Sequence, residues 1–241
     1  MLFGWFYWDW TVLIVLPAIL FASIAQIRVK TTFEKYARLG THSGLTGADA
    51  ARRLLNANGL YDVSIVRTEG TLTDHYDPRN RTLYLSREVH DMNTTSAIGV
   101  ACHEAGHAIQ HAESYAPLHV RMALVPVCNF GSRLAMPLFL IGLFLAADFG
   151  YLFMVAGILC FSVATLFQLV TLPVEFNASR RALAGMTECG LLYGKEVPQA
   201  KEVLSAAAMT YVAALATSLL SLLRLIVIAN NRRRYWGFGL Y

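Results

Sequence analysis

Two histidines four residues apart, His103 and His107, stand out because a glutamate, Glu104, directly follows the first of them. On an α-helix, residues at i and i+4 lie one turn apart on the same face, so both imidazoles can reach one ion. Zinc suits two neutral imidazoles and a carboxylate, with a fourth position left for water. In such an HExxH helix the glutamate is placed to act as general base on the water that the metal activates. A chance match is the alternative, and a third ligand would argue against it.

The third ligand must come from elsewhere in the chain. His111 lies one further turn along the same helix, but ligands at i, i+4 and i+8 of a straight helix span too far for one ion. Glu175 is the better candidate, because it lies where an apolar run ends and a carboxylate at a lipid boundary needs a partner. The alternative for Glu175 is a salt bridge with Arg180 or Arg181.

The composition indicates a membrane protein. The chain has 241 residues, of which 56% are hydrophobic and 15% charged, whereas an ordinary soluble domain carries about a quarter charged residues. The net charge of +4 is modest and the basic residues are scattered, which argues against nucleic-acid binding. The four cysteines form no CxxC motif, so we expect small buried hydrophobes and neither a disulfide framework nor a cysteine zinc site.

Apolar runs predict about four membrane-spanning segments, at 10–27, 122–147, 151–174 and 204–229. About 20 apolar residues suffice to cross a bilayer. The short break at 148–150 predicts a transmembrane hairpin formed by the second and third runs. The last run carries several hydroxyl side chains and Arg224, so it either spans the membrane or lies partly in the interface.

Both ends of the chain resemble interfacial anchors. Trp5, Trp8 and Trp10, in and next to the N-terminal segment 1–9, flank the first run like an aromatic belt. The first run lacks a basic n-region and a cleavage site, so we interpret it as an uncleaved anchor and not as a signal peptide. The tail 230–241 is basic and aromatic, and its three consecutive arginines at 232–234 are typical of a helix end in lipid headgroups.

Two polar stretches, 28–121 and 175–203, carry most of the charges. Four spans place both stretches on the same side of the membrane, so together they can build one site. Within the first stretch, the patterns predict an amphipathic helix, a strand, a strand hairpin and the helix with the motif, at 44–60, 61–68, 74–86 and about 94–114. We therefore predict a mainly α membrane protein with a small α+β zincin-like catalytic domain between the first and second spans.

Lysines and arginines near the spans bear on the orientation of the chain. Nine of them lie on the side of the polar stretches and three on the far side, which favours a domain facing the cytoplasm. The three far-side arginines argue the other way, unless 204–229 does not fully cross.

Four blocks of the sequence resemble, in the same order, the YugP-type membrane zinc metallopeptidases of bacteria. The blocks are GLTGADAARRLL, LTDHYDPRNRTLYLS, AIGVACHEAGHAIQHA with YAPL, and LPVEFNASRRAL. That family is related to the HtpX and CaaX-prenyl-protease type of membrane gluzincin, which carries HExxH on one helix and a glutamate ligand on a later one. The resemblance implies one Zn(2+) per chain, with His103, His107 and Glu175 as ligands and Glu104 as general base.

The resemblance also suggests supporting residues. In the HtpX-like pattern an aspartate four residues after the glutamate ligand supports a histidine ligand. Ser179 stands at that position here and accepts a hydrogen bond without a negative charge, and Asn177 is a second candidate for the role. The concentration of polar residues at 74–77 makes His75 and Tyr76 candidates for stabilising an oxyanion.

Gluzincins in general pair an edge strand before the active helix with an extended peptide. The resemblance therefore implies a substrate-binding edge strand, formed by Thr82, Leu83, Tyr84, Leu85 and Ser86. An ordinary structural hairpin is the alternative.

Together these features predict a membrane-embedded zinc endopeptidase of the bacterial plasma membrane. We expect a polypeptide substrate and the lipid bilayer as partners, with no nucleic acid; a homo-oligomer or a membrane partner protein stays open. The alternative is a membrane assembly or adaptor protein with a structural zinc site and no proteolytic activity. A structural site would be closed by a fourth protein ligand, but the nearest candidates, His111 and Cys102, have poor geometry, and Glu104 would be unnecessary.

Overall fold

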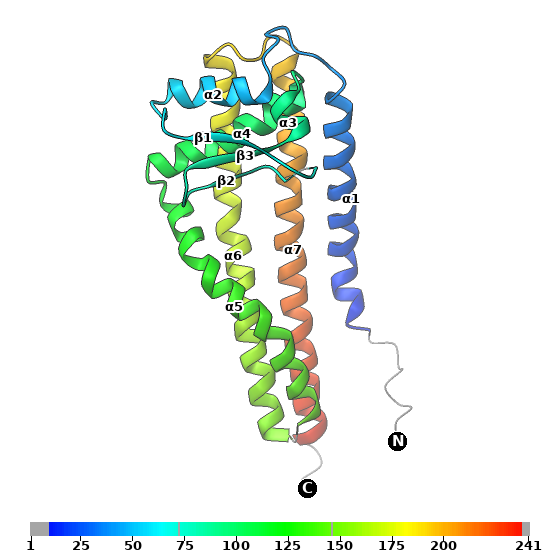
Figure 1. Cartoon of the computed structure of the whole chain (residues 1–241). Helices are drawn as coiled ribbons and strands as arrows, with labels where there is room; N and C mark the ends of the chain where they lie inside the picture. Colours follow the sequence, from blue (N-terminus) through cyan, green and yellow to red (C-terminus); the bar gives the residue numbers. More distant parts are fainter. Residues whose placement is uncertain (1–9, 72, 146, 238–241) are drawn as a thin grey trace. The chain divides into compact units, whose positions relative to one another are not determined.

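The computed structural model describes residues 10–71, 73–145 and 147–237. Its elements, in chain order, are α1 (Val12–Tyr36), α2 (Gly47–Ala57), β1 (Ser64–Thr68), β2 (His75–Asp77), β3 (Thr82–Ser86), α3 (Arg87–Asp91), α4 (Thr95–Ala112), α5 (Ala116–Phe144), α6 (Ala147–Glu188) and α7 (Glu196–Gly237) (Figure 1). The predicted mainly helical fold, with a small α+β part between the first two long helices, is confirmed. Trp5 and Trp8 of the expected aromatic belt lie outside the described residues, as does the end of the tail 230–241, and Trp10 is exposed.

Four helices in the described part of the chain are long and apolar enough to cross a membrane. They are Val12–Tyr36, Ala116–Phe144, Phe149–Glu188 and Glu196–Arg232. The last of these has a mean hydropathy of 2.3 in its most apolar window. Its length and hydropathy therefore suit a full span as well as the first three do.

The chain forms two compact units, described separately below. We call Met1–Ile24, Arg121–Val170 and Tyr211–Tyr241 the helical unit, and Ala25–Val120 with Thr171–Thr210 the mixed unit.

Glycines bring α5 and α6 into close contact within the helical unit. A Cβ atom added to Gly150 would lie 2.7 Å from the carbonyl oxygen of Gly142, and one added to Gly157 would lie 2.7 Å from that of Ala135. The break predicted at 148–150 was wrong, since these residues belong to α6, which begins at Ala147. Gly150 serves helix packing rather than a turn.

The mixed unit contains one three-stranded sheet with the strand order β1-β3-β2. β1 runs parallel to β3, and β2 runs antiparallel to β3 with His75 opposite Tyr84, so the predicted hairpin is confirmed. β3 is therefore the central strand, and the prediction that residues 82–86 form a substrate-binding edge was wrong. β1 pairs with β3 along its whole length and β2 pairs with it along 82–84, and Leu83 and Leu85 are fully buried, as expected for a central strand.

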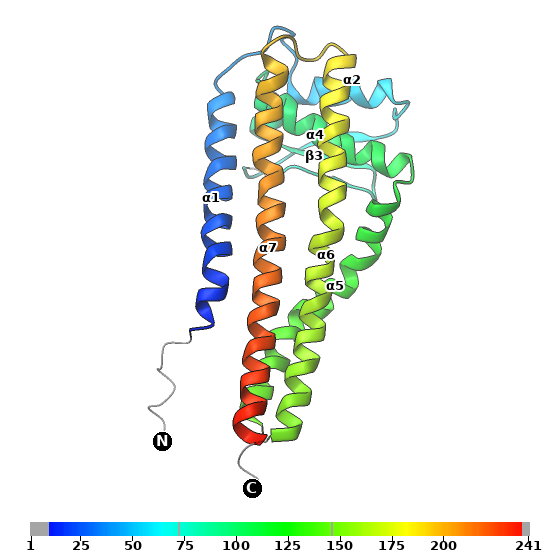
Figure 2. The same ribbon diagram turned by 180° about the vertical axis from the view of Figure 1, so that it is seen from behind.

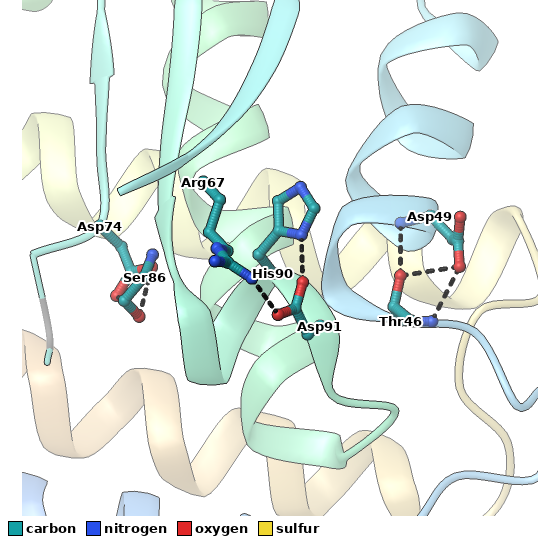
Figure 3. Close-up of polar contacts among 7 residues, drawn as sticks. All are labelled: Thr46, Asp49, Arg67, Asp74, Ser86, His90 and Asp91. Carbon is teal, nitrogen blue, oxygen red and sulfur yellow. Dashed lines mark hydrogen bonds and ion pairs between the residues drawn. The ribbon is translucent and has the colours of Figure 1, made fainter. Parts of the chain in front are cut away.

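Side-chain hydrogen bonds fix the end of β3 and the start of α2. The Ser86 backbone N–H donates to Asp74 Oδ1 at 2.7 Å, which ties the start of β2 to the end of β3 (Figure 3). At the start of α2, the Asp49 N–H donates to Thr46 Oγ1 (3.1 Å) and the Thr46 N–H donates to Asp49 Oδ2 (3.2 Å). This is a capping box, and it satisfies two N–H groups that the helix leaves free.

The core of the mixed unit is built around α4. α2 buries Ala51, Leu54 and Leu55 against it, while the ends of α6 and α7 lie beside it, as seen from behind in Figure 2. This surrounds α4 with packed elements and fixes the position of the side chains that it carries.

Candidate metal site

The helix α4 carries the HExxH motif on a rigid base. Its N-cap is Thr94, whose Oγ1 accepts a hydrogen bond from the Ala97 N–H at 3.3 Å. Ile98 and Ala101 are fully buried in the core, as is Cys102. Burial raises the pKa of the Cys102 thiol, and the nearby Cys189 adds to the rise, so the thiol stays protonated and is a poor metal ligand.

His103, His107 and Glu175 come together from two helices. His103 Nε2 lies 3.2 Å from Glu175 Oε2, and His107 Nε2 lies 3.5 Å from the same oxygen. The three potential ligand atoms lie within 4.8 Å of one another, and Glu175 is only 2% exposed. Arg181, one of the two arginines considered as ion-pair partners of Glu175, pairs with Glu113 at 2.6 Å. The arrangement directs two imidazole nitrogens and a carboxylate at one point.

Hydrogen bonds on the far side of each imidazole hold the two rings. Ser179 Oγ lies 3.1 Å from His103 Nδ1, at the position where the sequence pattern placed a supporting residue. Gln110 Oε1 lies 3.0 Å from His107 Nδ1. Each Nδ1 is engaged in this way, and the Nε2 atoms face Glu175, so Nε2 is the nitrogen of each ring that is placed to bind a metal ion.

Glu104 is buried next to these ligands with only 8% of its surface exposed. Among the residues that the structure describes, its carboxylate has no hydrogen-bond or ion-pair partner. Burial raises the pKa of the nearby Asp74 carboxyl; hydrogen bonds from Ser86 oppose the rise and the charge of Glu104 adds to it. Glu104 and Glu175 place two buried carboxylates beside the histidines, so a positive ion close to them would be stabilising. Donor set and charge together fit a zinc ion.

Comparison with known proteins agrees with this geometry. The protein family described as "Putative neutral zinc metallopeptidase" matches residues 11–230. The chain belongs to this family of zinc metallopeptidases. It is also 50% identical to "Putative membrane protease YugP" of Bacillus subtilis (strain 168) over 210 residues, which are 87% of this chain and 92% of that protein. The resemblance seen in the four sequence blocks is thereby confirmed. No solved structure is significantly similar to the chain.

Other polar residues of this metallopeptidase lie near the motif but outside the cluster of three. Tyr76 Oη is 2.9 Å from His111 Nδ1, so this histidine has its own partner on β2. Burial lowers the pKa of His111, and the charges of Arg81 and His119 lower it further, which keeps its ring neutral. His75 is exposed, stacks on Tyr84 with ring centroids 4.9 Å apart and bonds through Nδ1 to the Thr73 carbonyl (2.8 Å). Neither His75 nor Tyr76 joins the metal-ligand cluster, and their oxyanion role stays a prediction.

Asn177 supports the site through another residue. Its Oδ1 accepts hydrogen bonds from Gln110 Nε2 at 2.9 Å and from Arg181 Nε at 2.7 Å. It therefore contacts the partner of His107 and not a histidine itself. Gln110 was missed in the sequence, although a glutamine three residues after a ligand histidine on an apolar helix is a usable signal.

Gly106 allows α4 and α6 to approach closely enough to form the ligand cluster. A Cβ atom added to Gly106 would lie 2.7 Å from the backbone carbonyl oxygen of Ala178. Ala178 lies between Glu175 and Ser179 on α6, so this contact sets the distance of both side chains from the histidines. A larger residue at 106 would push the two halves of the metallopeptidase site apart.

Proposed function

We propose that the chain is a membrane-embedded endopeptidase in which His103, His107 and Glu175 hold one zinc ion and Glu104 is the general base. The observation that carries the proposal is the convergence of two imidazole Nε2 atoms and a buried carboxylate beside the buried Glu104. Membership of the zinc metallopeptidase family and the identity to the membrane protease support the same reaction class.

The proposed reaction needs one proton carrier from the protein. Zinc, when bound, supplies a Lewis acid that polarises the peptide carbonyl and makes water a better nucleophile at neutral pH. Glu104 accepts a proton from the water as its oxygen bonds to the carbonyl carbon. Glu104 then donates that proton to the peptide nitrogen as the carbon–nitrogen bond breaks, which restores its carboxylate. The products are a new carboxyl group and a new amino group.

The remaining residues keep this arrangement in place. Ser179 and Gln110 orient the two imidazoles, and the 2% exposure of Glu175 holds its carboxylate away from bulk water. In the adaptor alternative a fourth protein ligand would close the site, and the cluster found among the described residues comprises only His103, His107 and Glu175. An open position suits a catalytic site better than a structural one.

The experiment that tests the proposed function measures cleavage of a fluorescently labelled unfolded protein by the purified chain in detergent. We expect cleavage that a zinc chelator abolishes and that added zinc restores, because the ligand histidines and Glu175 act through the ion. Cleavage at an unchanged rate in a sample shown to be free of zinc would contradict the proposal.

We further propose that the chain lies in the plasma membrane with the polar stretch 28–121 facing the cytoplasm. The excess of lysines and arginines beside the spans on that side supports this orientation. Tyr61 is 74% exposed and lies in this stretch, so a Tyr61→Cys variant provides a labelling site. A membrane-impermeant thiol reagent should label it only after the cells are permeabilised; labelling in intact cells beyond that of the wild type would reverse the orientation.

A further inference from the structure

Gln110 is a fully buried amide whose polar atoms are all engaged. Its Oε1 lies 3.0 Å from His107 Nδ1, and its Nε2 donates to the Val174 carbonyl at 2.8 Å and to Asn177 Oδ1 at 2.9 Å. A glutamine amide has two N–H donors and one carbonyl acceptor. Both N–H groups and the oxygen therefore have a partner in this single arrangement.

The orientation of this amide follows from neighbouring groups that can only donate or only accept a hydrogen bond. The Arg181 guanidinium can only donate, so the Asn177 atom that it contacts at 2.7 Å must be the oxygen. The Val174 carbonyl can only accept. The Gln110 atom facing both oxygens must therefore be the amide nitrogen, and the atom facing His107 must be the oxygen.

The same logic determines the protonation of His107. Because Gln110 Oε1 can only accept, Nδ1 of His107 must carry the hydrogen, which leaves the lone pair of the neutral ring on Nε2. Nε2 is the nitrogen that lies 3.5 Å from Glu175 Oε2. Ser179 cannot impose this choice on His103, since a hydroxyl group can rotate to donate or to accept.

The contacts that begin at Gln110 on α4 pass through α6 and return to the end of α4. Arg181 pairs through Nη2 with Glu113, the C-cap of α4, at 2.6 Å. Glu113, Arg181, Asn177 and Gln110 thus connect the end of α4 through α6 to the ring of His107.

We propose that Gln110 is a positioning residue that fixes the tautomer and the ring orientation of His107 for metal binding. The inference rests on the proposed function, because it takes His107 to be a zinc ligand. Gln110 does not touch the ion or the substrate; it acts through His107. Groups that hold a ligand histidine in this way typically change metal affinity by about 10- to 100-fold when they are removed.

The test compares zinc dissociation constants, measured by competition with a chromophoric chelator, for the full chain in detergent. Gln110→Met removes the amide with little change in length, and we expect zinc binding to weaken by about 10- to 100-fold. Gln199→Met is the matched control, because Gln199 lies on α7 in the same unit and accepts a hydrogen bond from Thr95 Oγ1 at 3.3 Å, away from the ligands. We expect its zinc affinity to equal that of the wild type.

A second measurement distinguishes a positioning role of Gln110 from a general loss of stability. With Co(II) in place of zinc, the visible absorption spectrum should change in Gln110→Met and stay unchanged in Gln199→Met. Wild-type affinity and an unchanged spectrum in Gln110→Met would overturn the inference. If Gln110→Met does not fold, Gln110→Asn replaces it, since its amide is one methylene too short to reach His107 Nδ1. Zinc binding weakened by at least about threefold then supports the inference, and unchanged binding overturns it.

Failure of this inference can be distinguished from failure of the proposed function. A wild-type chain that binds no zinc contradicts the proposed function directly. A wild-type chain that binds zinc equally well with or without the Gln110 amide leaves the proposed function intact and rejects only the positioning role.

Discussion

Replacing Glu104 by glutamine is expected to lower the rate of peptide cleavage by about 10²- to 10⁴-fold while zinc stays bound. The amide occupies the same space as the carboxylate, but it cannot take a proton from water and return it to the leaving nitrogen. Zinc should remain, because Glu104 is not one of the three converging ligands. The measurement combines cleavage of a labelled unfolded protein with the zinc content of the same purified sample.

The control for Glu104→Gln is Glu88→Gln, which removes an exposed carboxylate in the first turn of α3. This variant should cleave at the wild-type rate. If an active wild type and Glu104→Gln hold equal zinc and cleave equally fast, the general-base mechanism is wrong. If Glu104→Gln loses its zinc, Glu104 takes part in holding the ion, and the adaptor alternative with a closed structural site gains support.

Replacing Gly106 by alanine should both destabilise the fold and weaken zinc binding. The new Cβ atom would lie 2.7 Å from the Ala178 carbonyl oxygen, and this backbone atom cannot move without moving α6. Overpacking of this kind costs about 1–3 kcal/mol of unfolding free energy. Glu175 and Ser179 flank Ala178 on α6, so a shift of α6 carries the carboxylate and the hydroxyl away from the histidines. Thermal unfolding in detergent and chelator competition measure the two effects.

Gly99→Ala is a matched control on the same helix. A Cβ atom added there would meet the Ala200 Cβ atom at 3.6 Å, an ordinary van der Waals distance. Alanine is favoured over glycine inside a helix by about 1 kcal/mol, so this variant should be as stable as the wild type or more stable. The close-contact explanation fails if Gly106→Ala is as stable as Gly99→Ala and binds zinc as tightly.

The residues of the site differ in how well the sequence alone predicts their role. His103 and His107 share one helix, so their spacing alone predicts that they meet one ion. Glu175 lies 72 residues after His103, and its candidacy depended on where the spans end. Gln110 has a local signal, but only the structure shows that its partners Val174 and Asn177 come from α6.

The order of the strands in the sheet could not be predicted from the sequence for a related reason. The alternation of residues 82–86 predicts a strand but does not say which strands flank it. β1 adds to β3 in parallel through a connection that passes β2, so the pairing is non-local. The break at 148–150 was mispredicted for a different reason, because a glycine that packs one helix against another, as Gly150 does, carries the same local signal as a turn.

The central claim is that two histidines and one glutamate hold a zinc ion, and zinc K-edge X-ray absorption of the purified wild-type chain tests it most directly. The geometry predicts about one zinc per chain with two imidazole nitrogens at about 2.0–2.1 Å, oxygen atoms completing the shell and no sulfur. A zinc–sulfur distance of about 2.3 Å, which would bring a cysteine such as Cys102 into the shell, would contradict the account. So would a folded wild-type chain that binds no zinc when the ion is supplied.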